Sequence, residues 1–148
     1  MGIRRKSREL IVQTLYALSY SETDDYLLHL NYINIYKDIL NDLAAENGID
    51  KNDGIYKYAE KILKAILPKI SDLDQLINKY IIDYEIEKIG LLDLIILRLA
   101  VYEMLYARIP APVVIDEAVE ISKRFCAEKS PQMINAILDL FKEKELNT

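Results

Sequence analysis

Residues 89–107, IGLLDLIILRLAVYEMLYA, are apolar on nearly every side of a helical projection, which predicts a long helix buried at the centre of the fold. Asp93, Arg98 and Glu103 interrupt the stretch, so it lacks the roughly 20 consecutive apolar residues of a membrane span. On both sides of it, apolar residues recur at helical spacing, and glycine and proline number only four each. The sequence therefore predicts an all-α protein without a sheet.

About seven helices are expected outward from this stretch. Turn signals support their ends: Asn47-Gly48 as a left-handed C-cap, Ser71 and Ser130 as N-caps, and Pro112 and Pro131 in first turns. The expected ranges are residues 4–20, 24–46, 53–67, 71–80, 89–107, 112–125 and 130–145. A weak boundary near residues 68–71 divides three helices from four. Residues 80–86, YIIDYEI, also have strand character, which leaves a second interpretation open there.

The charge of the chain is unevenly distributed. Residues 1–10 contain Arg4, Arg5, Lys6 and Arg8 against Glu9, a formal charge of +3. Because the whole chain carries −5, the other 138 residues carry −8. The single cysteine and single histidine argue against a disulfide and a His-rich metal site. No signal peptide, phosphate-binding glycine loop or catalytic constellation is evident, so we expect a cytoplasmic protein that is not an enzyme and has no cofactor or metal.

The basic cluster opens the first expected helix, where the partial positive charge of a helix N-terminus makes cations unfavourable. Such a local conflict is typical of a functional site, and a bound polyanion such as RNA would resolve it. Tyr16, two turns further along, could offer a stacking face to an unpaired base. A solvated terminus and an acidic protein partner remain alternative interpretations.

Three ordered motifs resemble the NusB family of bacterial transcription antitermination factors. They are RRKSRELIVQTLY at residues 4–16, ILRLAVYEM at 96–104 continuing with IPAPVVIDEAVEISKRF at 109–125, and AEKSPQMINAILD at 127–139. The resemblance implies one all-α RNA-binding domain over residues 1–148, with helical-bundle subdomains of about residues 1–68 and 69–148. It also implies no catalytic activity, and either a monomer or a homodimer.

The function that the resemblance implies is binding to boxA, a single-stranded element of ribosomal RNA transcripts. The implied partner is NusE, a ribosomal small-subunit protein, within an RNA polymerase antitermination complex. By motif, the RNA-binding residues are Arg4, Arg5, Lys6, Arg8, Tyr16, Lys129, Ser130, Gln132 and Met133. The NusE contacts are Tyr80 and Asp93, and because Asp93 interrupts an apolar run, we expect it to face a surface or a partner.

One RNA-binding stretch departs from the family pattern. Gln132 replaces a basic residue and Met133 an aromatic one, which puts a phosphate contact and base stacking in doubt, while Lys129 returns a charge nearby. If the basic arm neutralises about four phosphates, the log–log salt slope of binding to single-stranded RNA is near −3. Two other functions remain open: an RNA-targeting module of a ribosomal RNA methyltransferase system, and a helical protein-interaction module without specific RNA binding.

Overall fold

The computed structural model describes residues 2–19, 26–81 and 89–146, with side chains described outside residues 26–34. The chain divides into two compact units, Met1–Lys69 and Ile70–Thr148, one residue from the division expected between residues 68 and 69. The first unit contains α1 (Ile3–Ser19), α2 (Tyr26–Glu46), α3 (Gly54–Ile66) and a 3₁₀ turn (Leu67–Lys69). The second contains α4 (Ile70–Asn78), α5 (Leu91–Leu105), α6 (Ala111–Phe125), α7 (Ser130–Phe141) and a π-helical segment (Lys142–Leu146).

In the described part of the chain, all regular secondary structure is helical and no strand occurs, so the all-α prediction is confirmed. Residues 82–88, which cover most of the stretch with strand character, lie outside the described residues. Within the described ranges, no helix is long and apolar enough to span a membrane.

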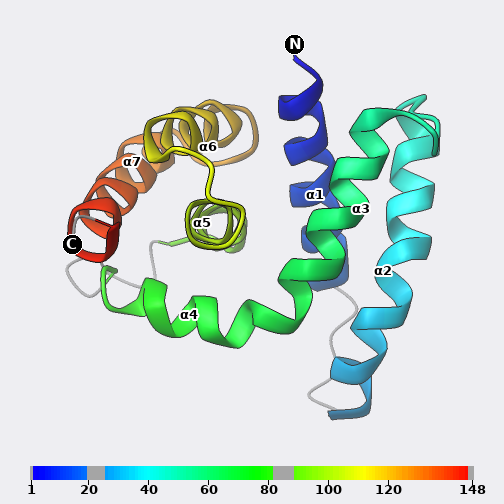
Figure 1. Cartoon of the computed structure of the whole chain (residues 1–148), viewed down its shortest axis with the longest axis horizontal. Helices are drawn as coiled ribbons and strands as arrows, with labels where there is room; N and C mark the ends of the chain where they lie inside the picture. The colour runs from blue at the N-terminus through cyan, green and yellow to red at the C-terminus, as the bar shows by residue number, and fades with distance from the viewer. Residues whose placement is uncertain (1, 20–25, 82–88, 147–148) are drawn as a thin grey trace. The chain divides into compact units, whose positions relative to one another are not determined.

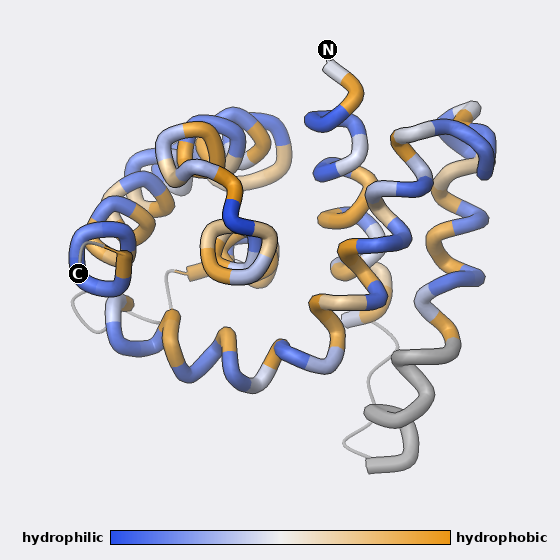
Figure 2. The backbone as a smooth tube through the Cα atoms, in the orientation of Figure 1, coloured by the Kyte–Doolittle hydropathy of each residue, from blue (hydrophilic) through white to orange (hydrophobic). Residues whose placement is uncertain are grey.

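In the first unit, α1 packs against both α2 and α3, and α1 and α3 lie side by side with their first turns at the same end (Figure 1). Helix α3 is amphipathic, and apolar and polar residues alternate along it in Figure 2. Ala59, Leu63 and Ile66 are completely buried, whereas Lys57 and Lys61 are exposed on the opposite side. Helical periodicity therefore orients α3 with its lysines toward solvent.

The connection between α2 and α3 follows the turn chemistry of the sequence. Gly48 has a φ of 67°, and the N–H of Ile49 donates to the carbonyl of Ala44 at 2.8 Å, which closes α2 with the expected left-handed cap. The Asp53 side chain then accepts a hydrogen bond from the Ile55 N–H at 2.9 Å and caps the start of α3.

The prediction that Ser71 caps the fourth helix is wrong. Helix α3 ends at Ile66, and the chain continues directly through the 3₁₀ turn into α4, which begins at Ile70, so Ser71 lies inside the helix. The physical reason is that an N-cap residue needs a non-helical backbone, whereas the 3₁₀ turn that contains Pro68 runs directly into α4 and Ser71 is already helical.

The second unit is built around α5, as the apolar stretch predicts. Helices α4, α6 and α7 all pack against α5, which Figure 1 shows end-on between them. Ile95, Leu97 and Val101 are at most 1% exposed. Arg98 makes a bidentate ion pair with Asp74 of α4, with N–O distances of 2.7 and 2.8 Å, which fixes α4 on α5.

Candidate nucleic-acid interface

The start of α1 presents cations without a compensating acid in its first turn. Arg4 and Lys6 are exposed, and Arg5 is partly exposed. The first N–H groups of a helix have no intrahelical acceptor, so they add to the positive potential of these side chains. This end of α1 can therefore attract a polyanion, and Lys6 is exposed to it.

Arg8 differs from the other three cations, because its side chain is only 4% exposed. It lies one turn before the buried Ile11 and two turns before the buried Leu15, on the helix face that enters the core. Arg8 and Glu9 both take part in interactions within the structure. Arg8 is therefore the least accessible of the four cations in this structure, and its predicted role in RNA binding stays a prediction.

A contact that the sequence did not predict joins the basic cluster to α3. The guanidinium carbon of Arg4 lies 3.6 Å from the ring centroid of Tyr58, well inside the range of a cation–π interaction. Tyr58 is partly exposed. Nothing in the local sequence pairs these two residues, which are 54 positions apart, so only the packing of α1 against α3 reveals the contact.

Tyr16 also lies on α1, nearer its C-terminal end, and is partly buried with interactions of its own. Its predicted role in base stacking stays a prediction.

The second predicted RNA contact is the start of α7. Lys129 occupies the N-cap position without a side-chain capping hydrogen bond, and Pro131 lies in the first turn as expected. Lys129 and Gln132 are exposed, and Met133 is partly exposed. The prediction that Ser130 is the N-cap is wrong, because Ser130 is the first residue of the helix. Its side chain is only 5% exposed, and its predicted RNA contact stays a prediction.

Asp93 does not face a surface, as the interrupted apolar run had suggested, because its side chain is 4% exposed. Its carboxylate accepts a hydrogen bond from the Gly90 N–H at 2.8 Å, which caps the start of α5 from the third helical position. The thiol of Cys126, at the end of α6, also donates to Asp93. Burial, followed by this carboxylate, raises the pKa of Cys126 to about 12.

Tyr80, the other predicted NusE contact, is partly buried against the end of α7. Its ring meets Phe141 edge-on at a centroid distance of 5.7 Å, and its hydroxyl donates to the carboxylate of Glu145. Burial and then the Glu145 carboxylate raise the pKa of Tyr80 to about 12. These contacts tie the C-terminal π-helical segment to the end of α4, and the role of Tyr80 in binding a partner stays a prediction.

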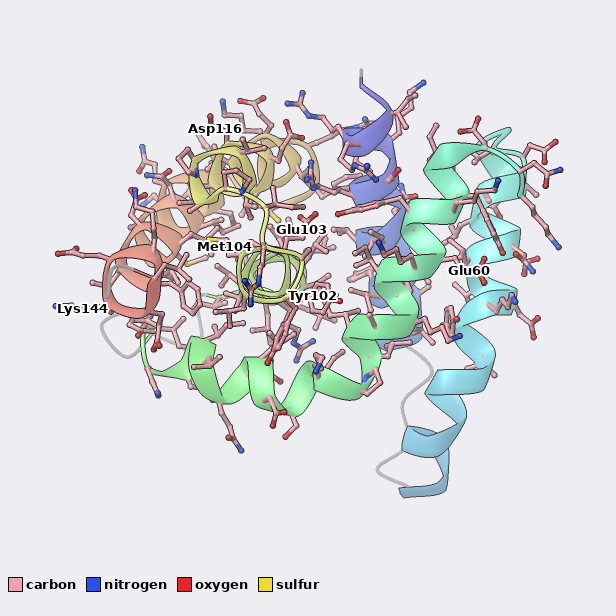
Figure 3. All side chains as sticks on the ribbon, viewed as in Figure 1. Glu60, Tyr102, Glu103, Met104, Asp116 and Lys144 are labelled. Carbon is pink, nitrogen blue, oxygen red and sulfur yellow. The ribbon has the colours of Figure 1, made fainter. Side chains whose placement is uncertain are left out.

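A partly exposed ion pair joins α2 and α3 within the first unit. Glu60 of α3 points toward α2 in Figure 3 and pairs with Lys37 at 3.3 Å. Among the described residues, no group of three or more His, Cys, Asp or Glu side chains is placed to hold a metal ion. Two surfaces remain as candidates, each within its own unit: the exposed basic start of α1 with Tyr58 in the first, and the start of α7 in the second.

Comparison with known proteins identifies relatives over nearly the whole chain. The NusB family model matches residues 5–143. The transcription antitermination protein NusB of Thermodesulfovibrio yellowstonii is 33% identical over 144 residues, covering 97% of this chain and 93% of the relative. The solved structure of T. maritima NusB is 27% identical, with a TM-score of 0.72 over 97% of this chain and 92% of that one. A crystal structure of the antitermination factors NusB and NusE in complex with double-stranded RNA shares the fold at 22% identity, with a TM-score of 0.76 over 97% of this chain and 98% of that one.

Proposed function

The chain belongs to the NusB family, and we propose that it is a transcription antitermination factor that binds single-stranded boxA RNA of ribosomal RNA operon transcripts together with NusE. The observation that supports this most is the match of the family over residues 5–143, a range that contains most of the basic cluster and the start of α7. The function is one of binding without catalysis, exercised in the cytoplasm as part of an RNA polymerase antitermination complex.

The start of α1 is the electrostatic part of the proposed RNA site. Lys6 and Arg5 neutralise phosphates, and the exposed N–H groups of the helix end favour the same charge. Phosphate contacts fix the position of the strand, but they do not read its sequence. Arg8 contributes indirectly, because its burial fixes the face that α1 presents.

The start of α7 is the second part of the proposed RNA site. Lys129 supplies one further cation, and the exposed amide of Gln132 can both donate and accept hydrogen bonds with an unpaired base. Met133 offers an apolar surface in place of an aromatic ring. The proposed site therefore keeps phosphate binding at α7, while its base preference depends more on hydrogen bonding than on stacking.

Binding of NusE is proposed for the second unit on family grounds. Direct contact through the Asp93 carboxylate does not fit its burial, so its contribution is to hold the first turn of α5, where Leu91 is 40% exposed. Tyr80 is partly exposed, but its hydroxyl is engaged by Glu145.

Fluorescence anisotropy with labelled boxA RNA and a scrambled strand of the same length, each with and without NusE, tests the proposal. We expect salt-dependent binding that is tighter for boxA and tighter again with NusE. Equal affinity for the two strands under both conditions would contradict specific boxA recognition. Absence of salt-dependent RNA binding would instead favour a helical protein-interaction module.

A further inference from the structure

We propose that Tyr58 is a positioning residue of the RNA site, which holds the Arg4 guanidinium as a flat platform on which one unpaired base stacks. The inference rests on the proposed RNA-binding function and adds to it a residue of α3 and a mode of base contact. It arises from the contact between Arg4 of the basic cluster and Tyr58 of α3.

The geometry is that of a stacked pair. The guanidinium carbon lies 3.6 Å from the centroid of the Tyr58 ring. One face of the guanidinium therefore rests on the ring, and because Arg4 is exposed, the opposite face is the one that an incoming base meets. Bases of single-stranded RNA stack on planar arginine groups as well as on aromatic rings.

The choice of a tyrosine has a physical consequence. A carboxylate could also order Arg4 at the start of α1, but it would cancel the positive charge that attracts RNA. The tyrosine ring is neutral, so it restricts the side chain through its negative face and leaves the charge in place. Part of the entropy cost of ordering Arg4 is thereby met before RNA arrives, which is preorganisation of the site.

The pair also reduces the conflict at the start of α1. A cation in the first turn of a helix is disfavoured by the helix dipole, and the face of an aromatic ring offsets this by attracting the cation. Since the first turns of α1 and α3 lie at the same end of the first unit (Figure 1), the ring is within reach of Arg4. The packing of the two helices thus creates the platform.

The test measures RNA affinity for the wild type and four variants of the full chain: Tyr58→Leu, Tyr58→Phe, Arg4→Lys and Lys64→Gln. The RNAs are boxA and a series of boxA strands in which one base at a time is replaced by an abasic nucleotide. Arg4→Lys keeps the charge but removes the planar group. Lys64→Gln changes an exposed lysine at the other end of α3 and is the control. Thermal melts followed by circular dichroism verify that each variant is folded.

We expect Tyr58→Leu to weaken boxA binding about fivefold and Arg4→Lys about tenfold, whereas Tyr58→Phe and Lys64→Gln bind like the wild type. At one position of the RNA, the abasic replacement should cost the wild type about tenfold and cost Arg4→Lys and Tyr58→Leu far less, because the two changes remove the same contact.

The proposal is overturned if Tyr58→Leu and Arg4→Lys weaken every RNA of the series by the same factor, since that is the result of a general structural or electrostatic role. Wild-type affinity of Tyr58→Leu also overturns it, as does a loss in Tyr58→Phe. In these cases wild-type binding to boxA remains, and the proposed function survives. If the wild type does not bind boxA, both the function and this inference fail.

Discussion

Replacement of Lys6 by glutamine tests how the basic start of α1 binds RNA. Each phosphate contact contributes about −0.7 to the log–log salt slope for a single strand. If Arg4 stacks on a base as proposed and the nearly buried Arg8 makes no phosphate contact, the cations of the proposed site that contact phosphates are Arg5, Lys6 and Lys129. The expected wild-type slope is therefore about −2, shallower than the value near −3 that four cations would produce.

Loss of the Lys6 charge should make the slope about −1.4 and lower the affinity on the order of fivefold at about 0.1 M salt. Fluorescence anisotropy titrations of boxA RNA across a range of salt concentrations measure both quantities. Lys64→Gln is the matched control, because it makes the same change in net charge at an exposed position. A slope and affinity in Lys6→Gln indistinguishable from those of Lys64→Gln would refute the reasoning.

Three further predictions concern the residues that the structure buries. Arg8→Glu should destabilise the fold by roughly 3 kcal/mol, because it places an opposite charge where a guanidinium is 4% exposed; a urea melt with a wild-type midpoint would contradict this. Asp93→Asn should lower the pKa of Cys126 and speed its alkylation by iodoacetamide at pH 9, since the carboxylate is one cause of the raised value; an unchanged rate would refute the link. The pKa of Tyr80 is raised to about 12 in the folded chain, from an ordinary value of 10.0. The protonated hydroxyl therefore stabilises the fold below pH 10, and this contribution to the free energy of unfolding should be lost between about pH 10 and 12. The loss should be smaller in Tyr80→Phe, and identical urea midpoints of the two proteins from pH 9 to 12 would exclude a role for the Glu145 contact.

Local chemistry was enough to predict the helices and most of their ends. The all-α class follows from periodicity and scarce glycine, and the cap at Gly48 follows from the need for a positive φ after α2. Pro112 and Pro131 lie in first turns for a similarly local reason, the absence of an N–H. Each of these features depends on residues within one or two turns of each other, so the order of residues along the chain contains the information.

The positions of the charged side chains depended on packing between helices distant in sequence. Arg8 and Arg4 lie one turn apart on α1, yet one enters the core and the other reaches the ring of Tyr58 on α3. Asp93 interrupts an apolar run but is buried, because Gly90 and Cys126 supply its hydrogen bonds. Burial and hydrogen bonding depend on what the other helices bring to a position, and residue type alone does not specify them.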